Sequence, residues 1–311
     1  MSIIGKQDRI EKHYMKNKER FADLCNVILF QGDVVLEPEH IHELDTSSLA
    51  IVHQGEQMML PVERLRDVLN SCNIGVTDDA AYVIVGVENQ SEVHYAMTVK
   101  CMLYDVLKYV EQVEQIGTKN RAQKRCVNSA EFLSGLRKDD KLIPIVTIVV
   151  LWNDAGWDGA RSLHDLLDFP DARLKQYVPD YRINLVAPSE LTDEMFDLFR
   201  TNLGDALAFI KYSNDESAME KLFKERQSSL DYETVSLINA LTDARILCQE
   251  ERKVIGMCKA WDDHMKRGEN TVFNCFELIC KGVTSVAELV NAGISQEVAE
   301  RALQMWATRE N

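Results

Sequence analysis

The first residues that suggest chemistry follow an apolar run in the first third of the chain. Residues 81–87 read AYVIVGV, a composition rich in β-branched side chains that predicts a buried strand. Glu88, Asn89 and Gln90 follow directly, with no turn signal before them. Alternate residues of a strand project to one face, so we expect Glu88 and Gln90 side by side with the Asn89 carbonyl between them. The strand end therefore offers a carboxylate, an amide and a backbone oxygen.

A second carboxylate, Asp67, lies in the preceding segment RLRDVLNSC, residues 64–72. If Asp67 ends a strand beside Glu88, two carboxylates and a backbone oxygen converge, and such ligands suit Mg²⁺ or Mn²⁺. That ion would polarise a phosphate and lower the pKa of an attacking water. Two alternatives stay open, because residues 64–72 also have helical spacing, and a glutamate at a strand end is often exposed or paired with a lysine.

A basic segment, TKNRAQKR at residues 118–125, carries four bases and no acid. The chain as a whole has a net charge of −15, which argues against nonspecific coating of nucleic acid. A local basic patch on an acidic protein can still bind a phosphate backbone, and a solvated loop is the alternative. The candidate phosphate-binding side chains of this segment are Lys119, Arg121, Lys124 and Arg125.

Hydrophobic periodicity predicts the elements that position these residues. A helix is expected over residues 9–30, a hairpin over 49–60, a helix of about 20 residues over 95–115, and a strand covered on both faces over 142–152. The apolar stripe of the second helix is formed by Val99, Met102, Leu103, Val106, Val110 and Val113. The order is helix, two or three strands, helix, strand, which predicts an α/β layer with helices on a small mixed sheet.

The second half of the chain has a different character. Residues 181–186, YRINLV, are consistent with one more strand, and helical patterns predominate from Thr192 onward. Two further helical stretches are predicted over residues 230–268 and 271–308. The last stretch contains a helix pair joined by an Asn-Ala-Gly turn. Because that pair is acidic, an ordinary helical hairpin is favoured over a helix-turn-helix that reads DNA.

Composition places the protein in an ordinary class. Hydrophobic residues make up 46% of the chain and charged residues 27%, which is typical of a globular protein. No apolar stretch reaches the roughly 18 residues of a membrane helix, and the first twenty residues lack the apolar core of a secretory signal. We expect a cytoplasmic protein that does not enter a membrane.

Several co-linear segments resemble the Rpn family of bacterial recombination-promoting nucleases, also called putative transposases, of the PD-(D/E)XK nuclease superfamily. The resemblance covers roughly residues 9–225, and its segments, including RDVL and VIVGVENQSEVHYAM, lie within residues 21–45, 66–69, 83–113, 142–152, 156–169, 182–188 and 206–213. It implies a nuclease-like domain over residues 1–225 and a helical C-terminal region over 226–311. It also implies a restriction-endonuclease-like core of helix, three strands, helix and strand.

The resemblance assigns roles to individual residues. Asp67 corresponds to the metal-binding aspartate of the second core strand, Glu88 corresponds to the acidic residue of the (D/E)XK motif, and Gln90 stands at the lysine position. Asp23, on the first helix, is a third candidate carboxylate by analogy with helical acidic residues in some superfamily sites. Lys100, one turn into the second long helix, is a candidate phosphate contact.

Two departures from the superfamily pattern bear on activity. Arg66, and not proline, precedes Asp67, and Gln90 replaces the lysine. Family members commonly have this glutamine, but an amide cannot supply positive charge. The resemblance implies a Mg²⁺- or Mn²⁺-dependent DNA endonuclease active in recombination, with DNA as its partner and a possible homo-oligomeric state. The alternative is a catalytically inactive nuclease-fold protein that acts as an interaction module.

Overall fold

The structure, a computed structural model, describes most of the first two thirds of the chain and parts of the rest. The described residues are 4–53, 59–74, 82–215, 217–218, 229–242, 246, 254–256, 275, 278–279, 283, 285–292, 294 and 296–307. They fall into two compact units. The first comprises Met1–Asn214 with Ser236–Leu241, and the second comprises Asp215–Val235 with Thr242–Asn311. All the predicted site residues belong to the first unit.

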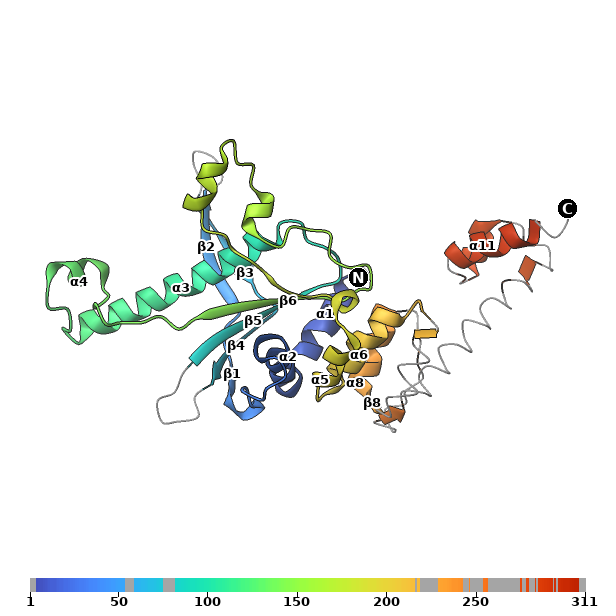
Figure 1. Cartoon of the computed structure of the whole chain (residues 1–311), viewed down its shortest axis with the longest axis horizontal. Helices are drawn as coiled ribbons and strands as arrows, with labels where there is room; N and C mark the ends of the chain where they lie inside the picture. Colours follow the sequence, from blue (N-terminus) through green and yellow to red (C-terminus); the bar gives the residue numbers. More distant parts are fainter. Residues whose placement is uncertain are drawn as a thin grey trace. The chain divides into compact units, whose positions relative to one another are not determined.

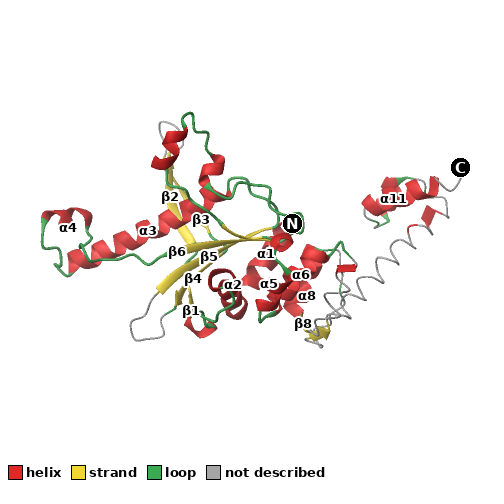
Figure 2. Cartoon of the chain, viewed as in Figure 1, coloured by secondary structure: helices red, strands yellow, loops and turns green. Residues whose placement is uncertain are grey.

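The first unit combines a twisted sheet with helices (Figure 1 and Figure 2). Its α-helices are α1 (Ile4–Met15), α2 (Lys18–Phe30), α3 (Met97–Ala122), α4 (Ser129–Ser134), α5 (Asp193–Leu198) and α6 (Asn202–Tyr212). Its strands are β1 (Ile41–Glu43), β2 (Ser47–His53), β3 (Met59–Leu65), β4 (Val68–Asn73), β5 (Tyr82–Gln90), β6 (Ile145–Leu151) and β7 (Asn184–Val186). Its short 3-10 helices are η1 (Pro38–His40), η2 (Leu163–Leu166), η3 (Ala172–Tyr177) and η4 (Pro188–Glu190).

The main sheet has five strands in the order β1-β4-β5-β6-β7. β1, β4 and β5 pair antiparallel, whereas β5, β6 and β7 pair parallel, with α3 in the crossover between β5 and β6. β2 and β3 form a separate hairpin. The prediction of an α/β protein with helices on a mixed sheet is therefore confirmed, and so is the hairpin.

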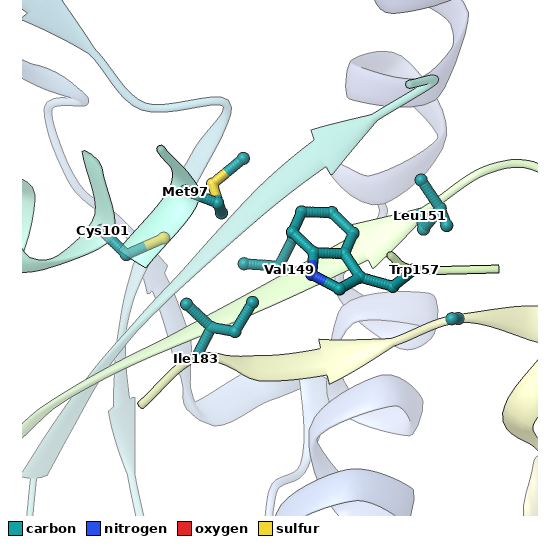
Figure 3. Packing of buried hydrophobic residues seen from close by; sticks show 7 residues of the cluster. Met97, Cys101, Val149, Leu151, Trp157 and Ile183 are labelled. Atoms are coloured by element: carbon teal, nitrogen blue, oxygen red, sulfur yellow. The ribbon is translucent and has the colours of Figure 1, made fainter. Parts of the chain in front are cut away.

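Both faces of β6 are covered, as its continuous apolar sequence predicts. Val149 packs on one face with Met97 and Cys101 of α3 (Figure 3). On the α1 side, Trp152 follows the strand and meets the ring of Tyr14 edge-on, with 6.2 Å between the ring centroids. The central strands thus lie between α3 and the N-terminal helices.

Two predicted elements near the N-terminus differ in the structure. The helix predicted over residues 9–30 is two helices, because the side chain of Asn17 caps α2 by accepting hydrogen bonds from the backbone N–H groups of Glu19 and Arg20. The segment 64–72, left open between strand and helical turn, forms the end of β3 and most of β4. Asp67 lies in the short connection between these two strands.

The apolar stripe predicted for α3 does not form its buried face. Val99, Val106 and Val110 are 42%, 49% and 47% exposed. The buried face carries polar residues with distant partners; for example, the Gln112 amide hydrogen-bonds both the N–H and the carbonyl of Ile143. The helix also continues through residues 118–122, part of the segment that the loop alternative placed outside it.

The second unit contains a small sheet and a helical pair among its described residues. β8 (Ser229–Asp231) pairs antiparallel with β9 (Val254–Gly256), so the prediction of helix throughout residues 230–268 was wrong at these positions. α8 (Tyr232–Leu241) spans the division between the units, and α10 (Val286–Asn291) is followed by α11 (Gln296–Ala307). No helix in the described part of the chain is both long and apolar enough to cross a membrane.

Candidate active site

Asp67 and Glu88 meet at the edge where β4 begins and β5 ends. The register pairs Val68 with Val87, and one further step of the same register sets Asp67 opposite Glu88. The Asp67 carboxylate is held there, because its Oδ2 atom accepts a hydrogen bond of 2.8 Å from the backbone N–H of Asn89. Asp67, which the sequence would place at the end of a strand, lies one residue before β4 and opposite Glu88 in the register.

Glu88 is a fully buried carboxylate. Its side chain has no exposed surface, and its Oε2 atom lies 2.9 Å from Lys100 Nζ. Its Oε1 atom has no hydrogen-bond partner among the described residues. Burial raises the pKa of Glu88 to about 7, with the positive charge of Lys100 acting in the opposite direction and the negative charge of Asp67 adding to the rise.

Lys100 brings a positive charge to the site from α3. Burial lowers its pKa, but the Glu88 carboxylate outweighs burial and leaves the pKa raised overall. The side chain is 28% exposed, so the ammonium group reaches solvent while it pairs with Glu88. Lys100 therefore offers, from a helix, the charge that Gln90 lacks on the strand.

α1 contributes two site residues that the sequence analysis missed. Lys12 Nζ lies 3.0 Å from Asp67 Oδ1 and also pairs with Asp8. Glu11 is buried, and its Oε1 atom accepts a 2.7 Å hydrogen bond from the Ser91 hydroxyl. Both residues lie in a charged segment without a clear apolar stripe, so the only available signal was their position on the first helix of the chain.

Glu11 resembles Glu88 in its electrostatics. Burial raises the pKa of Glu11 to about 7, the Ser91 hydrogen bond lowers it, and the negative charges of Asp8 and Asp67 raise it further. Within the described part of the chain its Oε2 atom has no hydrogen-bond partner. The site thus has two buried carboxyl groups that exchange protons near neutral pH.

Asn89 and Gln90 fix the end of β5. The Asn89 side chain accepts a 2.9 Å hydrogen bond from Trp152 Nε1. The Gln90 amide donates a 2.6 Å hydrogen bond to the Asn89 carbonyl, and the Gln90 carbonyl accepts one from the Trp152 N–H. The Asn89 carbonyl, predicted as a metal ligand, already holds one donor and keeps a second lone pair.

Asp23 has a structural role in place of the predicted metal ligation. Its carboxylate accepts hydrogen bonds from the backbone N–H groups of Arg200 and Thr201 and from the Thr201 hydroxyl, at 2.6 to 3.1 Å. These contacts hold Thr201, the N-cap residue of α6, and the residue before it. The described contacts of Asp23 include neither Asp67 nor Glu88, so we assign this carboxylate to the joining of α2 with α6.

A buried ion pair supports the residue that precedes Asp67. The Arg66 guanidinium donates a 2.6 Å hydrogen bond to Asp105 Oδ1 on α3, while the Tyr181 hydroxyl donates 2.6 Å to Asp105 Oδ2. Arg66 crosses β5 at Gly86, where an added Cβ atom would lie 2.2 Å from Arg66 Nη1. The glycine thus makes room for the arginine that replaces the expected proline.

The donor set suits a hard divalent cation. Asp67 and Glu88 supply two carboxylates, and Mg²⁺ in proteins is commonly held by one or two carboxylates together with waters. In the described residues no group of three Asp, Glu, His or Cys side chains is close enough to hold a metal ion. An ion here would therefore be bound partly by water or substrate.

The other predicted nucleic-acid contacts lie apart from this site. Lys119 and Arg121 belong to the last turns of α3, and Lys124 and Arg125 follow it, all four exposed. Only Lys100, at the first turn, reaches the carboxylates. The two ends of α3 thus carry two separate groups of positive charge.

Comparisons with known proteins return no counterpart for this arrangement. No protein-family model matches the chain, and no curated protein and no solved structure is significantly similar to it.

Proposed function

We propose that the protein is a divalent-metal-dependent DNA endonuclease with a PD-(D/E)XK-type core, akin to the Rpn nucleases that its sequence resembles. The observation that carries the proposal is Glu88, a buried carboxylate opposite Asp67 in the strand register, with an unpartnered oxygen and a lysine beside it. A buried carboxylate that keeps an oxygen without a hydrogen bond is costly, and such groups cluster at functional sites.

Each residue of the site has a chemical task under this proposal. Asp67 and Glu88 would hold Mg²⁺ or Mn²⁺, which when bound supplies the charge that polarises the phosphate and activates water. Lys100, partly exposed beside Glu88, would contact a phosphate oxygen and offset its developing negative charge. Glu11, with its pKa raised to about 7, can accept a proton from water near neutral pH.

The proposal is tested by metal binding and cleavage on matched variants. We expect the parent to bind Mn²⁺ by calorimetry and to nick supercoiled plasmid. Glu88→Gln keeps the side-chain size and removes the charge, so both signals should disappear. Glu92→Gln is the control, because Glu92 is exposed and lies four residues after Glu88, beyond the end of β5. Thermal denaturation confirms that each variant is folded.

Asp23→Asn is a second control. It distinguishes the carboxylate at Asp23 from the carboxylate proposed to bind metal at Glu88. This variant should lose stability, by about 1 kcal/mol for the weakened hydrogen bonds from Arg200 and Thr201, while it retains Mn²⁺ affinity. If Glu88→Gln cleaves DNA as the parent does, the proposed site is wrong. Loss of Mn²⁺ affinity in Asp23→Asn would show that Asp23 belongs to the metal site.

A second candidate function is a nuclease-fold interaction protein without activity. The observation that favours it is Gln90, whose amide is engaged with the Asn89 carbonyl at the position where a charged lysine is expected. A folded parent protein that shows no Mn²⁺ affinity would support this candidate and exclude the endonuclease.

A further inference from the structure

The far end of α3, with α4 and the chain that returns from it, exposes large apolar side chains. We call residues 117–138 the tip. Figure 1 shows α4 beyond the end of α3, away from the sheet. Val127, Phe132 and Leu133 are 84%, 69% and 85% exposed. Single exposed apolar residues are common, but three such residues within one short turn and helix indicate a contact surface.

The tip is a built structure. The buried Asn120 amide donates hydrogen bonds of 3.0 Å to the Gly135 carbonyl and 2.6 Å to Asp140. Gly135 ends α4 with a φ of +77°, and a Cβ atom there would lie 3.0 Å from the Gly117 Cα atom. Two glycines thus let the returning chain cross α3 closely. These contacts fix the backbone that carries the exposed apolar side chains.

The tip is also strongly basic, in contrast to the acidic chain. Its side chains with positive charge are Lys119, Arg121, Lys124, Arg125, Arg137 and Lys138. Arg137 pairs with Asp139 at 3.0 Å, whereas Lys119, Lys124 and Arg125 form no ion pair within the described residues. A concentrated positive charge on a protein of net charge −15 is complementary to a polyanion.

The order of these residues along the chain favours DNA over other anionic partners. Lys124 and Arg125 precede the apolar residues, and Arg137 and Lys138 follow them. Cations therefore precede and follow the apolar residues along the chain. Proteins that bend DNA have this arrangement, because cations hold the phosphates while apolar side chains enter between base pairs and unstack them.

We propose that the tip docks onto duplex DNA and inserts Phe132 and Leu133 into a base step. The inference rests on the proposed function and deepens it, since it gives the substrate as a bent duplex held at two places. Lys100 and Lys119 share one straight helix, so about 28 Å of axis separates them at about 1.5 Å per residue. A duplex that contacts both must extend over at least about eight base pairs at roughly 3.4 Å each.

The test uses the full-length Glu88→Gln protein without metal, so that binding is measured apart from cleavage. Its probes are a fluorescent 30-base-pair duplex for anisotropy and a duplex with donor and acceptor at its ends for bending. Replacing Phe132 and Leu133 with serine should abolish the bending signal and weaken binding about tenfold, with an unchanged salt dependence. Leu174→Ser with Tyr177→Ser is the matched control, because both residues are exposed and apolar.

Substitution of the basic residues should instead change the salt dependence of DNA binding. Lys124→Ala with Arg125→Ala removes two phosphate contacts, so the slope of log affinity against log salt should fall by about two. Unchanged binding and bending in the serine variant would overturn the inference. So would a Glu88→Gln protein that ignores DNA but binds phosphatidylserine vesicles through the tip, or a dimer that the serine variant converts to monomer in sedimentation.

Failure of this inference differs from failure of the proposed function. If the parent cleaves DNA and the serine variant binds and bends it equally well, only the insertion of Phe132 and Leu133 into a base step is excluded. If the Glu88→Gln protein bends DNA through the tip and the parent never cleaves it, the tip is supported and the proposed activity is overturned.

Discussion

The two ends of α3 carry the same kind of residue in opposite surroundings. At the first turn, Lys100 is mostly buried and lies 2.9 Å from a carboxylate that has no exposed surface. At the last turn and just beyond it, Lys119 and Lys124 are exposed and have no ion-pair partner among the described residues. One helix thus presents a partly buried cation paired with a carboxylate at one end and exposed cations at the other.

The difference teaches what burial does to a lysine. An exposed charge acts over about a Debye length and is weakened by salt, so it serves attraction and loose positioning. A buried charge beside a carboxylate is screened little, and it is held in one place. We therefore expect Lys100 to affect the chemical step and the tip lysines to affect DNA affinity.

The most direct test of this difference is the same substitution, lysine to methionine, at both ends of α3. Lys100→Met should reduce single-turnover cleavage at saturating DNA by about 100-fold or more, because it removes a charge from the reacting phosphate. Lys124→Met should leave that rate within a few-fold and weaken DNA binding. Lys175→Met, at an exposed site in η3, controls for the loss of one charge. Equal effects on rate at both ends would contradict the assignment.

Substitution of Gly86, which makes room for Arg66, should give the next largest effect. Gly86→Ala would place a Cβ atom 2.2 Å from Arg66 Nη1 and displace the guanidinium from Asp105. Such overpacking should lower the free energy of unfolding by about 1–3 kcal/mol, measured by urea denaturation. Mn²⁺ affinity should fall as well, because Arg66 precedes Asp67. An unchanged urea midpoint would show that the arginine is not fixed at this glycine.

The two ends of α3 should also differ, by a smaller amount, in how their properties depend on pH. Burial raises the pKa of Glu88 and Glu11 from 4.5 to about 7, so the folded protein binds more protons than the unfolded chain between these values. Stability without metal should therefore fall as pH rises from about 4.5 to about 7, and change little above.

Metal affinity should follow the opposite course, because protons compete with the ion for the same carboxylates. Mn²⁺ binding should weaken by up to about tenfold per pH unit below pH 7 for each proton released. DNA binding by the tip, measured without metal, should be constant between about pH 6 and pH 8, since Glu88 and Glu11 take no part in it. Calorimetry and anisotropy at several pH values check both, and a tip affinity that tracks Mn²⁺ affinity would contradict their independence.

The smallest expected effect is that of a substitution at Gly135 in the tip. Gly135→Ala would strain a residue with φ of +77° and press against Gly117 and Arg121. We expect a loss of about 1 kcal/mol, and a reduced DNA bending signal with an unchanged Mn²⁺ affinity. A bending signal equal to that of the parent would mean that the glycine crossing does not position the tip.

The sequence predicted those parts of the fold in which composition and position agree. β5 is rich in Val and Ile, and its polar end identified Glu88. Asp67 could be placed beside it only conditionally, because its segment has both strand and helical spacing. The register with β5, a long-range property, decided the matter. Lys100 was correctly placed on a helix near the site, but its partner lies in another element.

Other features could not be read from local pattern. The valines of α3 have the spacing of a buried face, yet the buried side holds Asp105 and Gln112, whose partners Arg66 and Ile143 are far away in sequence. Burial of those polar residues depends on tertiary hydrogen bonds, which periodicity does not report. Asp23 was a candidate by analogy with helical acidic residues of the superfamily, and nothing local shows that its carboxylate binds Arg200 and Thr201.

The strand register also determines when the site forms during folding. β4 and β5 are neighbours in the chain, whereas the pairing of Ile84 with Ile145 must wait for the whole α3 crossover to close. Closing a longer loop costs more entropy, so the local antiparallel pair should form first. Asp67 and Glu88 are therefore expected to meet while both are still hydrated, and Lys100 and the covering of Glu88 follow when α3 docks and β6 joins the sheet. The acidic centre is assembled before it is enclosed.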